Sequence, residues 1–279
     1  MVTGYYPKTI KEALQLKKEY PDAVLVAGGS DVMVVRKKAE WAIFLNQIEE
    51  MKNVVLDKDV LRIGAGATYR ELLENPEVPE ILKMPIRKIA SPAIRNVGTM
   101  AGNICNASPA GDTLPVLYAL NANVIKVSLE DSGRVKEEKV PMEAFILGIR
   151  KVALEKEELV AAIEIGKENF AGMTKTYYQK VGAREAEAIS KLSFVGLYQV
   201  EHEMITDIRI AFGSVGITVV RKKELEEKIK GLSLMQVREK KEEIIKWYDE
   251  ILHPIDDQRS TAVYRKKVCL NLLGDFLNT

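Results

Sequence analysis

The sequence contains few of the residues that bind metals or catalyse acid–base reactions. Only two cysteines and two histidines occur among its 279 residues: Cys105, Cys269, His202 and His253. Two cysteines are too few for a disulfide framework, so we expect none. Iron–sulfur clusters usually take four thiolates, so we also expect no metal or cluster held by this chain alone. We therefore assign no catalytic residue and no metal ligand, and we expect a bound cofactor to carry any redox or group-transfer chemistry.

The sequence also lacks a charge bias and a long apolar run. Its 41 basic and 40 acidic side chains leave a formal net charge of +1, whereas nucleic-acid-binding proteins usually carry a basic excess. No segment approaches the ~20 apolar residues that span a bilayer, and the N-terminus has no apolar signal core. We therefore expect a cytoplasmic protein with no nucleic-acid partner and no membrane insertion.

The N-terminal part alternates predicted helix and strand. Thr9 and Glu12 have the spacing of a capping box for a helix that ends before Pro21. A strand at residues 24–26, a helix at 32–38 and a strand at 41–45 follow. This β–loop–α–β order favours parallel strands.

The pattern changes after about residue 54. We predict a strand at 60–65, a short helix capped by Thr68, and a hairpin of 124–129 with 134–140 closed by Asp131-Ser132-Gly133. Another strand is predicted at 159–165. Further strands are predicted at 174–180, 193–200 and 206–212, followed by helices at 222–230, 233–248 and 261–277.

This order of elements predicts an α+β chain of two domains. The first would cover residues 1–168, with subdomains of about 1–55 and 56–168. The second, residues 169–279, would combine a small antiparallel sheet with a three-helix bundle.

A glycine pair follows the predicted strand at residues 24–26. Residues 27–31 read Ala-Gly-Gly-Ser-Asp, and a predicted helix begins directly after them. Glycines allow backbone N–H groups to converge on an anion, and a helix start behind them favours a pyrophosphate. Paired glycines also occur in ordinary strand-to-helix turns, so this loop alone leaves both interpretations open.

A second stretch of small residues lies at residues 96–112. Its glycine, alanine, asparagine and serine suit a backbone pressed against a ligand, with side chains completing the hydrogen bonds. The alternative is a long surface loop. Four apolar residues argue against that alternative because they would tie the segment into a core: Ile94, Val97, Met100 and Ile104.

The usual nucleotide signatures are absent. Gly64-Ala65-Gly66 is followed by Tyr69 where a Rossmann fingerprint would place glycine, and no glycine-rich loop ends in Gly-Lys-Ser/Thr. A phosphate-bearing ligand would have to be bound in another way.

Several ordered motifs together resemble the flavin-binding subunits of molybdenum hydroxylases, a family that includes xanthine dehydrogenases and aerobic carbon monoxide dehydrogenases. The motifs lie at residues 27–31, 94–103, 106–112, 159–165, 180–184, 188–190, 210–216 and 260–268. They span nearly the whole chain, which makes the resemblance specific. It implies a two-subdomain FAD-binding fold of the vanillyl-alcohol-oxidase/p-cresol-methylhydroxylase type, followed by a C-terminal domain.

The resemblance also assigns cofactor-binding positions. Residues 24–31 would bind one side of the FAD pyrophosphate and residues 99–103 the other, and Asp112 would hydrogen-bond the cofactor. Ile89 stands where the family usually has an aromatic residue, and Ala101 where it usually has glycine. The assigned residues are Val24, Leu25, Val26, Ala27, Gly28, Gly29, Ser30, Asp31, Ile89, Thr99, Met100, Ala101, Gly102, Asn103, Asp112, Val160 and Lys180.

Some of these residues have simpler interpretations. Lys180 could be a surface lysine at the end of a strand, and Asp112 could cap a helix that starts at Thr113 or Leu114. Cys105 is interpreted as a small packed residue rather than a redox thiol.

The function that the resemblance implies is electron transfer within a heteromeric oxidoreductase of the xanthine dehydrogenase type. A large partner subunit would hold the molybdenum cofactor and oxidise the substrate, and a small partner would carry two [2Fe–2S] clusters. This chain would accept electrons from those clusters at FAD and pass them to NAD⁺ or another acceptor.

Two other functions are weighed against this one. A stand-alone flavin reductase of the same fold would need a proton-donating Ser or Cys near a Phe-Phe-Lys-Asn-Pro-like stretch, which the sequence lacks. A non-catalytic interaction module would have lost FAD, and the intact Gly28-Gly29 and Gly102-Asn103 argue against it.

Overall fold

The N-terminal segment forms a small parallel sheet, so the predicted β–loop–α–β unit is confirmed. The computed structural model describes residues 2–35, 39–185 and 187–278. Strands β1 (Thr3–Tyr5), β3 (Trp41–Phe44) and β2 (Val24–Val26) pair in that order, and both pairings are parallel. Helix α1 (Ile10–Glu19) lies between β1 and β2 in the chain, and α2 (Val32–Val35) follows β2. Residues 36–38 of the predicted second helix lie outside the described residues.

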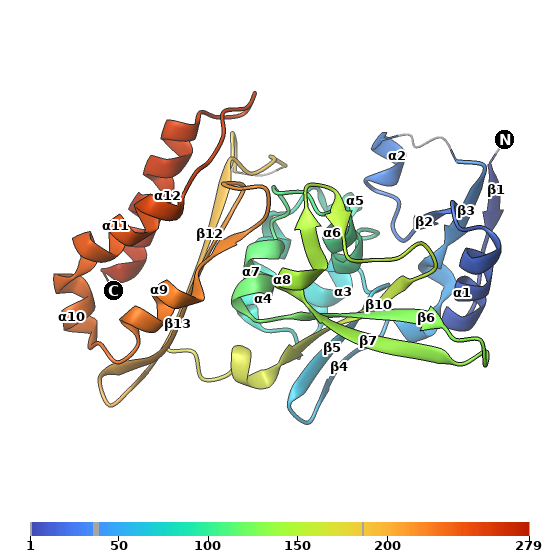
Figure 1. Ribbon diagram of the computed structural model, residues 1–279, viewed down its shortest axis with the longest axis horizontal. Helices are drawn as coiled ribbons and strands as arrows, with labels where there is room; N and C mark the ends of the chain where they lie inside the picture. Colours follow the sequence, from blue (N-terminus) through green and yellow to red (C-terminus); the bar gives the residue numbers. More distant parts are fainter. Residues whose placement is uncertain (1, 36–38, 186, 279) are drawn as a thin grey trace. The chain divides into compact units, whose positions relative to one another are not determined.

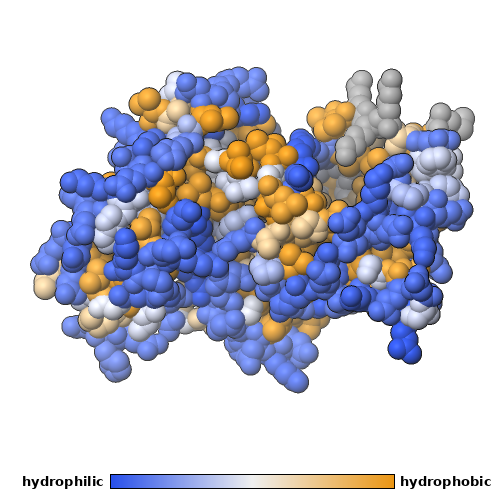
Figure 2. Space-filling model, viewed as in Figure 1, coloured by the Kyte–Doolittle hydropathy of each residue, from blue (hydrophilic) through white to orange (hydrophobic). Residues whose placement is uncertain are grey.

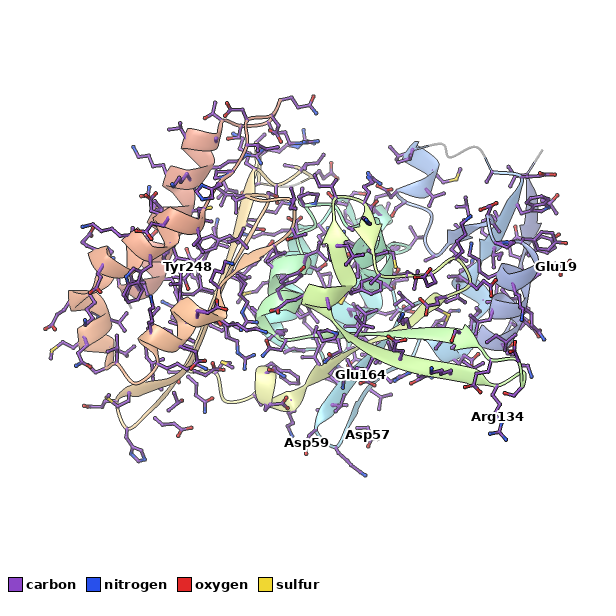
Figure 3. All side chains as sticks on the ribbon, viewed as in Figure 1. Glu19, Asp57, Asp59, Arg134, Glu164 and Tyr248 are labelled. Carbon is purple, nitrogen blue, oxygen red and sulfur yellow. The ribbon has the colours of Figure 1, made fainter. Side chains whose placement is uncertain are left out.

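A five-stranded antiparallel sheet comes next. Its strands are ordered β4 (Val54–Asp57), β5 (Val60–Gly64), β10 (Leu159–Gly166), β6 (Asn123–Leu129) and β7 (Val135–Pro141). The predicted hairpin is confirmed, because β6 and β7 pair along their whole length. Glu164 projects from the central strand β10 and forms ion pairs with Arg62 at 2.7 Å and Lys139 at 3.0 Å (Figure 3).

Residues 96–112, the second stretch of small residues, contain a helix, and Thr99, Ala107 and Asp112 beside it are buried, so the alternative of a long surface loop is wrong. Between β5 and β6 the chain contains α3 (Tyr69–Glu74), α4 (Glu80–Lys88), α5 (Pro92–Arg95), α6 (Met100–Asn106) and α7 (Leu114–Ala119). Met100 and Ile104 are buried as predicted. Ile94 and Val97 are 37% and 45% exposed, so the prediction that they join a core is wrong, because the short α5 turn leaves them at the surface.

A short turn-and-strand segment follows the β6–β7 hairpin. It consists of α8 (Met142–Phe145), β8 (Ile146–Gly148) and β9 (Lys151–Val152), and β8 pairs antiparallel with β9. Short 3₁₀ turns lie elsewhere in the chain: η1 (Leu45–Gln47) and η2 (Glu49–Met51) follow β3, and η3 (Lys167–Asn169) follows β10.

Residue contacts divide the chain into two compact units. Unit 1 consists of residues 1–78, 90–107 and 121–167, and unit 2 of residues 79–89, 108–120 and 168–279. Unit 2 therefore takes α4 and α7 from earlier in the chain. The predicted domain boundary at residue 168 stays a prediction.

The second unit is built on an antiparallel sheet. Strands β11 (Lys175–Val181), β12 (Leu192–Glu201), β13 (Met204–Gly213) and β14 (Val220–Arg221) pair in sequence order. Helices α9 (Lys223–Ile229), α10 (Leu234–Glu239), α11 (Lys241–Ile251) and α12 (Ala262–Leu277) follow. The predicted helix at 233–248 is thus two helices that meet at Lys240, whose ψ of 7° departs from helical values.

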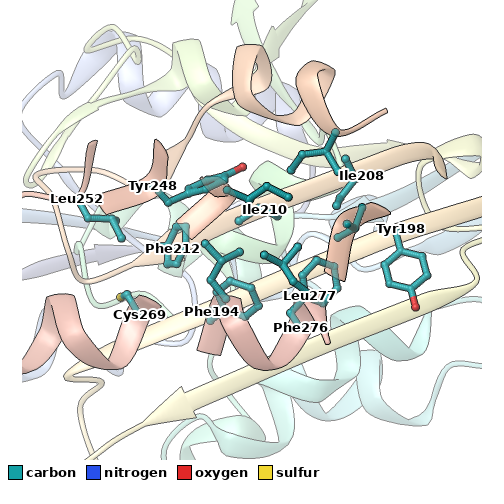
Figure 4. Close-up of a cluster of buried hydrophobic side chains, with 14 of the residues drawn as sticks. Phe194, Tyr198, Ile208, Ile210, Phe212, Tyr248, Leu252, Cys269, Phe276 and Leu277 are labelled. Carbon is teal, nitrogen blue, oxygen red and sulfur yellow. The ribbon is translucent and has the colours of Figure 1, made fainter. Parts of the chain in front are cut away.

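Helices cover both faces of this sheet. Helix α12 packs against β12 on one face, and α7 packs against β12 and β13 on the other (Figure 1). The α12 face carries a cluster of buried aromatic rings, in which the centroid of Phe194 lies 5.2 Å from Phe212 and 5.8 Å from Phe276 (Figure 4). This cluster is the apolar core of unit 2.

Polar and charged residues cover much of the visible surface, and hydrophobic areas interrupt them (Figure 2). The exposed apolar side chains include Met33 and Val34 of α2. None of the helices within residues 2–35, 39–185 and 187–278 combines the length and apolar character that crossing a bilayer requires.

Candidate cofactor-binding site

The two glycine-rich segments predicted from the sequence meet in unit 1. A Cβ added to Gly28 would lie 1.8 Å from the carbonyl oxygen of Val97 and 3.0 Å from the nitrogen of Gly98. No side chain other than hydrogen fits at position 28, so the backbone after β2 lies directly against the backbone before α6. The contact joins segments that lie about 70 residues apart in the sequence.

The loop after β2 offers unused hydrogen-bond donors. The backbone N–H groups of Gly28, Gly29 and Ser30 have no hydrogen-bond partner among the described residues. Gly29 has a φ of +71°, and a left-handed residue within such a run can turn successive N–H groups toward one point. A loop of this kind can bind an anion, and Gly28, Gly29 and Ser30 are only half-buried, so their N–H groups are accessible to one.

The second segment is held in place by a helix cap. The hydroxyl of Thr99 accepts a hydrogen bond from the N–H of Gly102 at 3.0 Å and thereby fixes the start of α6. Met100 and Ala101 are buried, whereas Gly102 is exposed and Asn103 is half-buried. Met100 and Ala101 therefore pack in the interior.

Strand β10 supports this arrangement from the five-stranded sheet. Helix α6 packs against β10, and Val160 on that strand is buried. The pairing of β10 with β6 is irregular between Val160 and Ala162, which marks a bulge at this position. Unit 1 therefore brings the loop after β2 and the α6 segment together, and Val160 lies on the strand against which α6 packs.

Asp31 belongs to a hydrogen-bond network that the sequence did not indicate. Its carboxylate accepts from the Asn106 amide at 3.2 Å and from the Arg150 guanidinium at 3.1 Å, and Arg150 also donates to the Asn106 side-chain oxygen. Arg150 lies 119 residues from Asp31 in the chain, in the turn between β8 and β9. No motif or periodicity marks it.

The remaining predicted residues lie in unit 2. The Lys180 ammonium forms an ion pair with the Asp112 carboxylate at 2.6 Å and donates to the Lys88 carbonyl oxygen at 3.0 Å. Ser190 donates to the other Asp112 oxygen. Ile89, the next residue after Lys88, is half-buried at the end of α4.

Two simpler interpretations of this cluster are wrong. Lys180 is 8% exposed rather than a surface lysine, because the strand β11 carries it inward to Asp112. Asp112 does not cap α7, whose N-cap residue is Thr113 and lacks a side-chain cap bond, because the Asp112 carboxylate is taken up by Lys180 and Ser190. Burial raises the pKa of Asp112, and the attraction of Lys180 and the hydrogen bond from Ser190 offset part of this effect.

Ser190 is a buried residue of this cluster that was not assigned to the site from the sequence. It is 2% exposed and is the last residue of the resembling segment 188–190, so the motif carried the signal that could have identified it. The hydroxyl of Tyr178 is also buried, and its pKa is raised by burial and by the charge of Asp112.

Two protein-family profiles match the chain. Residues 1–167 match the FAD binding domain in molybdopterin dehydrogenase, and residues 176–279 match the CO dehydrogenase flavoprotein C-terminal domain.

The chain belongs to the FAD-binding subunits of the molybdenum hydroxylases.

Similar proteins of this family occur in bacteria and archaea. The xanthine dehydrogenase FAD-binding subunit of Escherichia coli O157:H7 is 27% identical over 78% of this chain and 76% of its own. The glyceraldehyde dehydrogenase medium chain of Sulfolobus acidocaldarius is 29% identical over 94% and 92%. Reconstituted CO dehydrogenase from Oligotropha carboxidovorans shares the fold, with a TM-score of 0.88 at 22% identity over 99% of this chain and 96% of that one.

The residues of this FAD-binding subunit fit a dinucleotide in unit 1. Backbone atoms of Val97 and Gly98 occupy the space that a Cβ at Gly28 would need. The N–H groups of Gly28 to Ser30 are available to phosphate oxygens. By contrast, no group of three or more His, Cys, Asp or Glu side chains within the described ranges could hold a metal ion. The predicted α+β class is confirmed.

Proposed function

We propose that this chain binds the FAD diphosphate with the loop after β2 and the start of α6, and that it serves electron transfer within a multi-subunit molybdenum hydroxylase. The observation that carries the proposal is the contact of Gly28 with Val97 beside three unpartnered N–H groups. Backbone donors bind phosphate oxygens without a charged side chain in the loop, provided that no Cβ keeps the backbone at a distance.

The site residues keep the roles that the resemblance gives them. Residues 24–31 would bind one side of the diphosphate and residues 99–103 the other, while Val160, Ile89, Asp112 and Lys180 would contact the cofactor. The ion pair of Lys180 supports its role, because the ammonium has three N–H donors and the described contacts with Asp112 and Lys88 use two. The third donor is available to a polar edge of a ligand.

When bound, FAD supplies the one-electron and two-electron redox chemistry that links iron–sulfur clusters to a soluble acceptor. The chain itself would bind the cofactor, orient its ring and supply hydrogen bonds and charge around it. No nucleophile or general base is required of it. We propose a small [2Fe–2S] subunit and a large molybdenum-cofactor subunit as partners, and NAD⁺ as acceptor.

Xanthine dehydrogenase is the proposed type of holoenzyme. The resemblance around Lys180 and the FAD-binding subunit of Escherichia coli O157:H7 support it. An aldehyde-oxidising holoenzyme is a second candidate, because the glyceraldehyde dehydrogenase medium chain matches 94% of this chain. The large subunit would decide between these substrates.

The proposal is tested first on the full chain alone. Purified protein should be yellow or become yellow with added FAD, and denaturation should release FAD that chromatography identifies. Co-expression with a small [2Fe–2S] subunit and a large molybdenum-cofactor subunit should then yield a complex that contains molybdenum and iron. This complex should oxidise NADH with a dye as acceptor.

The alternatives give different results in the same experiment. A chain that remains colourless with excess FAD would support a non-catalytic interaction module. Flavin reduction linked to a UDP-sugar substrate would support a stand-alone flavin reductase. A holoenzyme that oxidises aldehydes but not xanthine would support the second candidate for the substrate.

A further inference from the structure

Arg150 connects the two segments of the candidate site through its side chain. Its guanidinium lies 3.1 Å from the Asp31 carboxylate in the loop after β2, and it also donates to Asn106 at the end of α6. Asn106 in turn donates to Asp31 at 3.2 Å. These three side chains therefore form a closed triangle that holds the loop against the helix.

The backbone of Arg150 is attached to the same helix end. Its N–H donates to the carbonyl oxygen of Ala107 at 3.0 Å, and its φ is 57°. This left-handed conformation costs a residue with a Cβ more than it costs glycine. Non-glycine residues that keep such a conformation are concentrated at functional sites, and here the arginine side chain makes contacts that glycine could not make.

The charges around the loops call for a cation at this place. Residues 24–31 and 96–107 contain a single charged side chain, the carboxylate of Asp31. A diphosphate bound at the N–H groups of Gly28 to Ser30 would be repelled by that carboxylate unless a cation paired with it. Arg150 provides the cation.

Arg150 also keeps donors for a ligand. The described contacts use its Nη1 atom, and the Nε and Nη2 groups have no hydrogen-bond partner within residues 2–35, 39–185 and 187–278. The side chain is 53% exposed, so these donors are accessible to a bound anion. An ion pair exposed to this extent contributes little to folding stability. Replacing Arg150 should therefore affect ligand binding more than stability.

We infer that Arg150 is a positioning residue and the counter-charge for the dinucleotide diphosphate in unit 1. It neutralises Asp31 and fixes the loop after β2 to the end of α6, so that the N–H groups of Gly28 to Ser30 can bind an anion. The Asp31 carboxylate then acts by holding Arg150 rather than by bonding the cofactor itself. This inference rests on the proposed binding of FAD.

The test neutralises the two charges singly and together in the full chain, with FAD affinity measured by flavin fluorescence titration. R150Q should weaken FAD binding about tenfold or more, the loss expected when a charge-assisted contact is removed. The double variant D31N/R150Q should recover most of that loss because the uncompensated carboxylate is gone. R150K should lie between R150Q and the wild type.

Two controls separate binding from folding. R150G relieves the left-handed backbone, so the thermal midpoint of the FAD-free chain should stay the same or rise while FAD affinity falls. R134Q removes the same charge from the exposed turn of the β6–β7 hairpin (Figure 3) and should leave FAD affinity unchanged. The FAD affinity of R150Q should also depend less on ionic strength than that of the wild type.

The outcomes are distinguishable. If the wild-type chain binds FAD and R150Q binds it equally well, or D31N/R150Q is as weak as R150Q, the inference is wrong and the proposed function stands. If R134Q weakens binding as much as R150Q, the role assigned to Arg150 is also wrong. A wild-type chain that cannot bind FAD overturns the proposed function and this inference together.

Discussion

Replacing Gly28 by alanine tests the central contact of the candidate site. The added Cβ would lie 1.8 Å from the carbonyl oxygen of Val97, whereas ordinary van der Waals contact begins at 3.4 Å. One of the two backbones would therefore have to move by about 1.6 Å. Neither atom belongs to a flexible side chain, so a rotamer change cannot relieve the clash.

The size of the effect follows from this displacement. Overpacking of this kind typically costs about 1–3 kcal/mol, which lowers the melting temperature of a chain this long by roughly 2–12 °C. A shift of about 1.6 Å is larger than the spread of N–H···O hydrogen-bond distances. At least one hydrogen bond from the loop to a phosphate would therefore be lost. Loss of one charge-assisted bond, about 1.5–3 kcal/mol, weakens FAD binding roughly ten- to a hundredfold.

The assay compares G28A with a variant that clashes elsewhere. FAD affinity is measured by fluorescence titration, and folding by the thermal midpoint in circular dichroism. In the control G196A, the new Cβ would lie 2.7 Å from the Phe276 ring in unit 2, so stability should fall while the loops of unit 1 are unaffected. If folded G28A binds FAD with wild-type affinity, the reasoning that places the diphosphate at Gly28 is refuted.

Three further substitutions make predictions about stability. K180M leaves the buried Asp112 carboxylate without its partner and should cost about 3–5 kcal/mol, part of which D112N should recover in the same chain. Burial opposes ionisation of Glu164, but hydrogen bonds from its two cationic partners outweigh this and lower its pKa. The resulting stabilisation is present above the ordinary pKa of 4.5 and is lost as the pH falls through the lowered value, so E164Q should be less sensitive to acid below pH 4.5. The Tyr248 hydroxyl is buried with no hydrogen-bond partner among the described residues, so Y248F should stabilise the chain by about 1 kcal/mol.

Urea unfolding followed by circular dichroism measures all three. A K180M chain as stable as the wild type would contradict the buried ion pair. An E164Q chain that loses stability in acid as steeply as the wild type would contradict the assignment of the lowered pKa. A destabilised Y248F chain would indicate that the hydroxyl has a partner, such as a bound water.

Local signals in the sequence predicted most of the elements. The helix start at Thr9, the turn at residues 131–133 and the alternation around β2 and β3 each involve residues a few positions apart, and these elements are present. The predicted capping box is only half formed, because the Glu12 carboxylate accepts from the Lys8 N–H and not from that of Thr9. The failures are also local. No proline or glycine marks the break at Lys240, and the exposure of Ile94 depends on packing that its apolar character does not reveal.

The pairing of charged side chains could not be predicted in the same way. Lys180 is 68 residues from Asp112, and Arg150 is 119 from Asp31. The sequence around a polar residue does not show whether its side chain faces solvent or a distant partner. The resemblance to a family selected Asp112 and Lys180, but it did not select Arg150 or Ser190.

Three properties could be read from the linear sequence: cysteine and histidine are scarce, small residues are concentrated at two places, and the elements follow an α+β order. Composition, caps and turns depend on neighbouring residues, so they can be interpreted before folding. The contact of Gly28 with Val97 and the pairing of Asp31 with Arg150 became visible only in the folded chain. Those contacts depend on how strands and helices pack over long sequence separations, and no short stretch of sequence specifies such packing.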